Sequence, residues 1–264
     1  MRIPKVMGIL NVTPDSFYSE SRNFSEESIR KRVRQIISEG ADIIDVGGCS
    51  TKPGSIPTSE KEELERVELG CKIVRDLNPE IPLSVDTFRS SVASMAIKQW
   101  NANIVNDVSG GEDPQMWDLV ASAKVGYVLT HNDSNKVIGD ITFNVVVDLS
   151  KKINDLHKLG ISDIIVDPGF GFGKKLQDNF QILDELKEIK KIGLPVLVGL
   201  SRKSMIYKSL DKKPEDSLIG TVALDAIALE KGADILRVHD VKEAVETVKL
   251  FSLLKKSPYD KFWN

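Results

Sequence analysis

The sequence has few cysteines, no long apolar run and almost no excess of charge of one sign. Its two cysteines, Cys49 and Cys71, do not form a CxxC pair, so neither a disulfide scaffold nor a zinc site is expected. A net charge of −3 provides no general attraction to nucleic acid or anionic lipid. No apolar run approaches the ~20 residues of a membrane span, and residues 1–7 lack the apolar core of a secretory signal. These absences predict a cytoplasmic protein that binds neither nucleic acid nor membrane.

Short apolar runs rich in valine and isoleucine alternate with longer amphipathic segments along the whole chain. The runs occupy residues 6–13, 43–48, 82–87, 104–109, 126–131, 163–168, 195–200 and 235–240. They predict buried parallel strands, and the segments between them predict amphipathic helices. Glycines able to end a helix in the left-handed conformation precede several strands: Gly40, Gly160, Gly193 and Gly232. Eight such units in 264 residues predict an α/β fold, a (β/α)8 TIM barrel, as a single domain over residues 1–264 with a peripheral tail at 257–264.

Polar residues collect at the carboxyl ends of the predicted strands, where a TIM barrel builds its active site. Each end supplies at least one group that can bind a ligand or ionise: Asn11, Asp45, Asp86, Asn106, Asp107, His131, Asp167, Ser201, Arg202, Lys203, Arg237, His239 and Asp240. Any one of these side chains could simply cap a helix or hold a loop. A complete ring of them indicates an active site.

The middle strands carry carboxylate and amide side chains. Asp86, Asn106 and Asp167 can accept and donate hydrogen bonds along the edge of a flat amino-heterocycle. The segment 167–175, DPGFGFGKK, resembles a phosphate loop but fits neither GxxxxGK[ST] nor GxGxxG, so a nucleotide fold is not expected. Its glycines would let the backbone approach a flat ligand while Phe172 presents its ring.

The last strands carry cationic side chains instead. Arg237 and His239 are separated by one residue on a predicted strand, so they point the same way and form a cationic clamp suited to phosphate or diphosphate. Phosphate sites recur at the last two strands of this fold. The alternative is that Arg237 only forms a salt bridge with Asp234 or Asp240. Two long polar loops, at residues 11–24 and 47–58, are candidates for lids.

Seven segments at strand ends together resemble the dihydropteroate synthase family. They are MGILNVTPDSF at 7–17, DVGGCSTKPG at 45–54, SVDTFR at 84–89, VNDVSGG at 105–111, DPGFGFGK at 167–174, VGLSRKSMI at 198–206 and LRVHDV at 236–241. The resemblance covers roughly residues 5–250. It implies a TIM-barrel enzyme of folate biosynthesis that condenses 6-hydroxymethyl-7,8-dihydropterin diphosphate with 4-aminobenzoate to give 7,8-dihydropteroate and diphosphate. It also implies a homodimer.

The resemblance further implies a role for each site residue. The residues that would bind the pterin are Asp86, Asn106, Asp167 and Lys203. Those that would hold the diphosphate are Asn11, Arg237 and His239. Those that would contact the aminobenzoate are Thr51, Pro53, Phe172, Lys203 and Ser204. Asn11 would also ligate Mg²⁺. Lys203, Arg237 and His239 would be catalytic, because in the family's mechanism the bond to diphosphate breaks before the amine attacks and the departing anion needs positive charge.

Three loop positions depart from the family pattern. The first loop has Ser19 where an aspartate is usual, with Glu20 as a neighbouring carboxylate that can substitute. The second loop has Lys52 where arginine is usual, which keeps the charge but loses the planar fork. Asn132 follows His131 where methionine is usual. These differences bear on the catalytic rate, on loop closure and on sensitivity to sulfonamides that mimic aminobenzoate.

Two other functions share part of this pattern. A methyltransferase that passes a methyl group from a methylated folate to a corrinoid protein would use the same pterin-binding residues, but it would not need the cationic clamp. A catalytically impaired paralogue that binds pterin for regulation or scaffolding is suggested by the altered loops. Diphosphate release coupled to dihydropteroate formation would distinguish the synthase from both.

Overall fold

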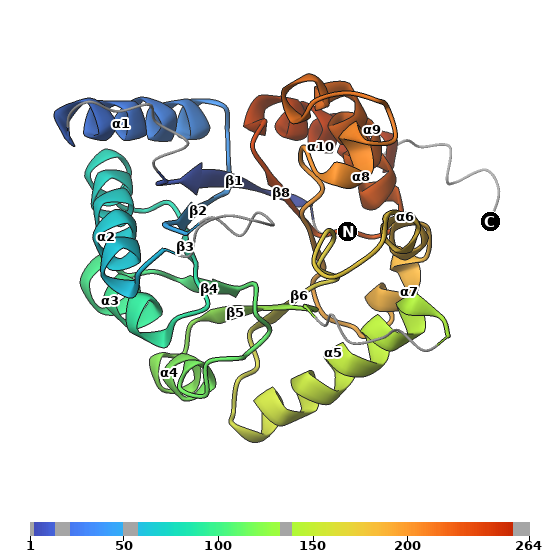
Figure 1. The fold of residues 1–264 in the computed structure, drawn as a ribbon, viewed down its shortest axis with the longest axis horizontal. Coiled ribbons are helices and arrows are strands. Elements are labelled where there is room, and N and C mark those ends of the chain that lie inside the picture. Colours follow the sequence, from blue (N-terminus) through green and yellow to red (C-terminus); the bar gives the residue numbers. More distant parts are fainter. Residues whose placement is uncertain (1–2, 14–21, 50–57, 133–138, 256–264) are drawn as a thin grey trace.

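The computed structural model describes residues 3–13, 22–49, 58–132 and 139–255, and in these ranges the strands form a parallel barrel inside a ring of helices (Figure 1). The strands are β1 Lys5–Asn11, β2 Ile43–Gly47, β3 Leu83–Asp86, β4 Ile104–Asp107, β5 Gly126–Thr130, β6 Ile164–Asp167, β7 Leu197–Val198 and β8 Ile235–Val238. Each of them overlaps one of the predicted runs. The predicted α/β barrel is therefore confirmed.

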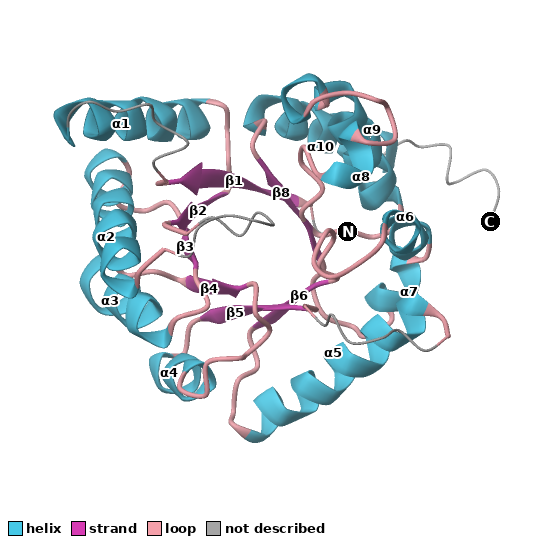
Figure 2. Ribbon diagram, viewed as in Figure 1, coloured by secondary structure: helices cyan, strands magenta, loops and turns pink. Residues whose placement is uncertain are grey.

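Helices form the outer layer around these strands (Figure 2). They are α1 Arg22–Ser38, α2 Glu60–Leu77, α3 Ser90–Trp100, α4 Met116–Ala123, α5 Ile141–Lys158, α6 Leu176–Asp184, α7 Leu186–Lys190, α8 Ser204–Tyr207, α9 Leu218–Glu230 and α10 Val241–Lys255. Local sequence sets several boundaries. Ser59 and Glu62 form a reciprocal capping box at the start of α2. The four glycines predicted to cap helices all have φ between +81° and +105°.

The strands lie in the order β6-β5-β4-β3-β2-β1-β8-β7, and every pair is parallel. Between β6 and β7 the ladder is reduced to one isolated bridge, Val166 to Val196. The N–H of Val166 donates to the carbonyl of Pro195 across this joint at 2.9 Å. We call this narrow joint the β6–β7 seam, because it closes the barrel with very little backbone pairing.

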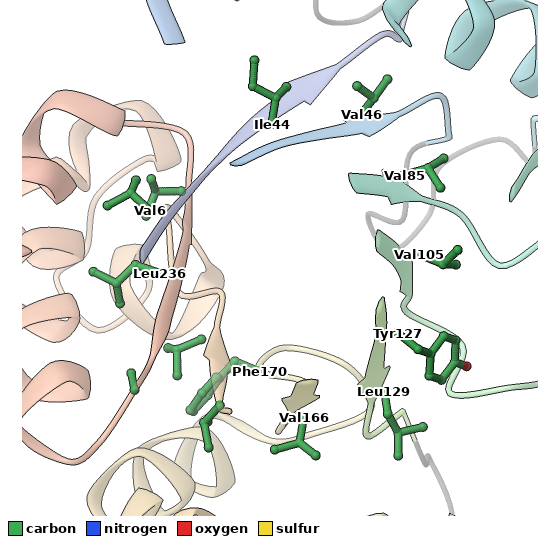
Figure 3. Packing of buried hydrophobic residues seen from close by; sticks show 14 of the residues in the cluster. Val6, Ile44, Val46, Val85, Val105, Tyr127, Leu129, Val166, Phe170 and Leu236 are labelled. Atoms are coloured by element: carbon green, nitrogen blue, oxygen red, sulfur yellow. The ribbon is translucent and has the colours of Figure 1, made fainter. Parts of the chain in front are cut away.

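Alternation along each strand divides the apolar residues into two clusters. Outward-facing side chains such as Val6, Ile44 and Val85 pack between the strands and the helices (Figure 3). A second, smaller cluster fills the interior of the barrel near the amino ends of the strands, and we call it the basal layer: Met7, Ile43, Val128, Ile165, Leu197 and Ile235. Successive side chains of a strand point to opposite faces. The residue two positions beyond each member of the basal layer therefore also points inward.

Candidate active site

Those next inward positions are mostly polar. Above the basal layer lie four buried or half-buried side chains, which we call the polar layer: Asp45, Asn106, Asp167 and Arg237. Asp86 lies one step closer to the mouth, because it pairs in register with Gly47, two residues beyond Asp45. The carboxyl ends of five strands thus place their polar groups around one space inside the barrel.

Arg237 joins the acidic and the cationic sides of this space. Its Nε donates to Oδ2 of Asp45 at 2.7 Å, and its Nη2 donates to Oδ2 of Asp86. The alternative that Arg237 pairs with Asp234 or Asp240 is wrong, since both of those carboxylates bind other cations. The cation from β8 therefore forms direct ion pairs with carboxylates from β2 and β3.

Burial shifts the pKa values of two acids in this space, Asp86 and Asp167, upward. It raises the pKa of Asp86 to about 7, although the charge of Arg237 opposes the shift. Burial likewise raises the pKa of Asp167, against the nearby charge of Lys203. For Arg237, burial would lower the pKa, but the carboxylates of Asp45 and Asp86 raise it above its usual range. Carboxyl groups with raised pKa values can donate hydrogen bonds as well as accept them.

Several buried polar atoms of the barrel interior lack a hydrogen-bond partner among the described residues: Asp45 Oδ1, Ser84 Oγ, Asn106 Oδ1 and Thr130 Oγ1. The amide nitrogen of Asn106 donates to Asp45 Oδ2 at 3.0 Å, which commits its donor side and leaves its carbonyl oxygen unpaired. Buried polar atoms of folded proteins are almost always paired, so unpaired ones grouped together indicate a ligand site. The interior presents this ligand with hydrogen-bond acceptors and hydroxyl groups.

Lys203 extends over this space from the end of β7. Its ammonium donates to the carbonyl of Phe170 and lies 5.0 Å from the centroid of the Phe172 ring. A Cβ placed on Gly199 would lie 3.9 Å from both Lys203 Nζ and Arg237 Cβ, so the two cationic side chains border the same inward position. Burial lowers the pKa of Lys203 to about 8. A cation and an aromatic ring therefore flank the mouth of the barrel together.

The glycine-rich loop after β6 is folded tightly against the end of β5. Gly169 has φ +72°, and a Cβ there would lie 2.0 Å from the carbonyl oxygen of His131, so no other residue fits. The N–H of Gly169 donates to Asp167 Oδ1 at 2.7 Å. Lys174 donates to the carbonyls of His131, Gly169 and Phe172 at 3.0, 2.9 and 3.2 Å. This loop carries Phe172, whose ring lies beside the Lys203 ammonium; that the ring faces a flat ligand stays a prediction.

His239 follows β8 and is held by its neighbours. Its Nδ1 lies 3.0 Å from Oγ of Ser201, and its backbone N–H donates to the same oxygen at 3.2 Å. Arg32 of α1 donates to its carbonyl. Burial lowers the pKa of His239 to about 4, and the charge of Arg237 contributes to the shift. The two side chains predicted to form a cationic clamp are therefore a charged guanidinium and a neutral imidazole.

The remaining predicted site residues differ in how far the structure describes them. Asn11 ends β1 and is half-buried, and its side chain makes no hydrogen bond within the described ranges. Ser204 begins α8 directly after Lys203 and is half-buried. Asn132 donates from its amide to the carbonyl of Val108 at 2.9 Å. Five residues named from the sequence lie outside the described part of the chain: Ser19, Glu20, Thr51, Lys52 and Pro53.

Three residues of the site were given no role from the sequence, although two of them, Asp45 and Ser201, were named in the ring of strand-end groups. Asp45 was visible as a strand-end carboxylate, and its spacing of two from Ile43 would have placed it on the inward face. Ser201 was visible in the same way. Arg32 lies in the middle of α1 with no distinguishing pattern, so its contact with the carbonyl of His239 could only be found in three dimensions.

The carboxyl end of this parallel barrel surrounds polar atoms without partners in the described ranges, two half-buried cations and an aromatic ring, which is where a barrel of this kind builds its active site. Comparison with known proteins identifies the class. Residues 7–239 match the family model described as "Pterin binding enzyme". None of the helices in the described ranges combines the length and apolar character needed to cross a membrane.

Relatives with the same fold identify a smaller group within this family. The dihydropteroate synthase of Clostridium beijerinckii is 41% identical over 254 residues, which cover 94% of this chain and 93% of that protein. The Xanthomonas albilineans dihydropteroate synthase, solved with 4-aminobenzoic acid, has a TM-score of 0.91 at 37% identity and covers 97% of this chain and 94% of its own. The structure of the same enzyme in complex with 7,8-dihydropteroate has a TM-score of 0.88 at 36% identity, with coverages of 97% and 95%.

The chain belongs to the pterin-binding enzyme family and, within it, to the dihydropteroate synthases. It is a transferase of folate biosynthesis. The recognition made from the seven sequence segments is therefore confirmed. The corrinoid methyltransferase, which shares the pterin-binding residues, is not supported by these relatives.

Proposed function

We propose that Asn106 and Asp167 of the polar layer, together with Asp86 one step closer to the mouth, bind the pterin ring of 6-hydroxymethyl-7,8-dihydropterin diphosphate. A pterin edge alternates donors and acceptors, and the raised pKa values of the two carboxyl groups suit them to both roles. The unpaired carbonyl oxygen of Asn106 supplies a further acceptor at the same depth. Lys203 lies over the ring face, next to Phe172. The grouping of unpaired polar atoms inside the barrel is the observation that carries this assignment.

Arg237, His239 and Asn11 hold the diphosphate in this proposal. The reaction breaks the bond between the pterin methylene carbon and the diphosphate oxygen, and the electron pair leaves with the diphosphate. Arg237 stabilises this growing negative charge, and the buried carboxylates around the ring stabilise the cation left behind. The amine nitrogen of 4-aminobenzoate then bonds to the methylene carbon and loses a proton to solvent. No covalent intermediate with the protein is required.

We further propose that Mg²⁺ accompanies the diphosphate. Mg²⁺ in proteins keeps several waters and binds one or two protein oxygens together with substrate phosphates. No group of three or more His, Cys, Asp or Glu that could hold a metal occurs in the described ranges, so an all-protein site does not fit. The half-buried amide of Asn11, with no hydrogen bond in those ranges, does fit a site shared with a phosphate. When bound, the ion would neutralise charge on the leaving group.

The second substrate, 4-aminobenzoate, binds at the mouth of the barrel in this proposal. Phe172, Lys203 and Ser204 come from two neighbouring loops, on either side of the β6–β7 seam, and frame one opening. Thr51 and Pro53 complete the binding site from the second loop, as the family resemblance implies. The complex of the Xanthomonas albilineans relative with 4-aminobenzoic acid supports this choice of substrate.

We propose that the chain is a single cytoplasmic domain that forms a homodimer through α9 and α10. These two helices pack against each other and expose several large apolar side chains: Ile219, Ile227, Leu250, Leu253 and Leu254. Apolar side chains grouped on one surface mark an interaction site. Sedimentation of the purified protein with and without the Leu253→Glu substitution tests this assignment. A wild-type monomer would contradict it.

An assay with purified protein, pterin diphosphate, Mg²⁺ and 4-aminobenzoate tests the proposed reaction. We expect equal amounts of diphosphate and 7,8-dihydropteroate. Diphosphate release without dihydropteroate would mean that the aminobenzoate site is absent. Pterin binding without release would identify the chain as the impaired paralogue instead.

A further inference from the structure

Ser201, directly after the end of β7, holds His239 at two of its atoms. The Ser201 hydroxyl oxygen accepts the backbone N–H of His239 at 3.2 Å and lies 3.0 Å from the ring nitrogen Nδ1. Ser201 is only 5% exposed, so water does not readily replace either contact. The backbone contact determines whether the hydroxyl donates to the ring nitrogen or accepts from it.

The direction of the ring contact follows from counting hydrogens. A serine hydroxyl has one hydrogen and two lone pairs, and one lone pair is taken by the backbone N–H. Among the described residues, the hydroxyl of Ser201 has no partner other than His239. If Nδ1 carried a hydrogen, two N–H groups would converge on Oγ and the buried hydroxyl hydrogen would be unpaired, which is unfavourable. The hydroxyl therefore donates to an unprotonated Nδ1.

The surroundings of the ring keep it neutral. Burial lowers the pKa of His239 to about 4, Arg237 lowers it further, and Asp240 opposes them. Arg202, next to Ser201 in the chain, and Arg32 of α1 act in the same direction as Arg237. A neutral imidazole has one N–H. With Nδ1 unprotonated, that hydrogen is on Nε2.

We propose that Ser201 is a positioning residue that fixes His239 in the tautomer with its hydrogen on Nε2. The inference rests on the proposed place of His239 at the diphosphate. An Nε2–H group donates to a phosphate oxygen, whereas an unprotonated Nε2 turns a lone pair toward the anion. Ser201 therefore determines whether the imidazole attracts or repels the leaving group, although Ser201 does not touch the substrate.

Other contacts hold the backbone around His239, so the hydroxyl can be removed without releasing the loop. Arg32 donates to the carbonyl of His239. Arg202 binds the next residue, Asp240, with Nε and Nη2 at 2.9 and 2.8 Å. We therefore expect Ser201→Val to change the protonation of the imidazole ring and to leave the backbone of His239 in place.

The tautomer can be observed directly by ¹⁵N nuclear magnetic resonance of the imidazoles. The chain has three histidines, and the signals of His239 are identified by their loss in His239→Gln. We expect the wild-type protein to show His239 protonated at Nε2 alone. Ser201→Val should populate both tautomers. Ser201→Thr introduces a side chain of the same size as valine but keeps the hydroxyl, so it should retain the wild-type pattern. Protonation at Nδ1 in the wild type, or identical spectra for the two variants, would overturn the inference.

Kinetics then separates this inference from the role of His239 itself. We expect Ser201→Val to lower kcat for diphosphate release roughly tenfold or more relative to Ser201→Thr, with an unchanged KM for 4-aminobenzoate. His239→Ala should lose at least as much. If His239→Ala released diphosphate at the wild-type rate, the proposed role of His239 would fail. If His239→Ala were impaired but Ser201→Val matched Ser201→Thr, only the role of Ser201 would fail.

Discussion

The basal layer and the polar layer of the barrel interior share the strands β2, β6 and β8, yet the first is apolar and closely packed and the second is polar and ion-paired. Basal-layer side chains such as Met7 and Leu197 are fully buried and apolar. Two residues further along, the polar layer contains an ion pair, an acid with a raised pKa and oxygen atoms that have no hydrogen-bond partner within the described ranges. The barrel thus concentrates packing at the amino ends of its strands and chemistry at their carboxyl ends. Substitutions in the two layers should therefore have separable effects on stability and on activity.

The largest expected effect is in the polar layer, at Arg237. We expect Arg237→Ala to lower kcat for diphosphate release by a factor on the order of 10²–10³, because it removes a preorganised charge from the leaving group. The substitution also leaves Asp45 and Asp86 unpaired, so its thermal unfolding should be measured beside its rate. Arg30→Ala is the matched control, since Arg30 also pairs with two carboxylates, but on the outside of the barrel. Near-normal release by folded Arg237→Ala would contradict the assigned role.

A smaller effect on activity is expected at Asp167. Asp167→Asn keeps the shape but removes one acceptor and the charge, so KM for the pterin diphosphate should rise about 10- to 100-fold. Asp113→Asn provides the comparison, because Asp113 likewise accepts backbone N–H groups, from Ser90 and Gln115, but outside the barrel interior. Steady-state kinetics with each variant measures the difference. Equal KM values in the two variants would show that Asp167 only holds its loop.

Substitutions in the basal layer should lower stability and leave activity unchanged. Met7→Ala should lower the free energy of unfolding by roughly 2–5 kcal/mol, because a cavity remains in a closely packed interior. Below its melting temperature the variant should keep the wild-type kcat and KM. Leu159→Ala, at an exposed position, should change stability by no more than about 0.5 kcal/mol. Denaturant unfolding combined with the activity assay checks both values. A loss of kcat in folded Met7→Ala would mean that the layers are not separable.

The smallest expected effect is a shift in pH dependence. Burial lowers the pKa of Lys203 to about 8, so its ammonium loses its proton, and with it the positive charge over the ring, as pH rises through that value. We expect activity to decline on this alkaline side. Lys203→Arg keeps its charge throughout, so its decline should begin at higher pH even if its maximal rate is lower. An unchanged alkaline limb in Lys203→Arg would assign the decline to another group.

Much of this comparison could be predicted from the sequence. Val and Ile runs marked each strand, and they placed Arg237 and Asp167 at the carboxyl ends of two of them. The barrel order then follows from the repeated strand–helix units. These features depend on local pattern, which is readable one segment at a time.

The ion pairs across the barrel could not be predicted in the same way. Arg237 is far from Asp45 and Asp86 in sequence, and its long side chain can reach several acids. Which of them it binds depends on rotamers chosen after the barrel closes. The neutral state of His239 is equally collective, because it arises from burial and from charges on several elements. The spacing of residues indicates which way such side chains point. It does not indicate which ion pairs they form or which of them are protonated.

Lys203 also has a mechanical part to play at the β6–β7 seam. Where the backbone ladder between these strands has shrunk to one bridge, the ammonium of Lys203 reaches from the β7 side to the carbonyl of Phe170 and to the ring of Phe172 on the β6 side. The same side chain therefore links the two sides of the seam and, in the proposed function, contacts both substrates. A substitution of Lys203 would therefore change both the turnover of the enzyme and the closure of the barrel between β6 and β7.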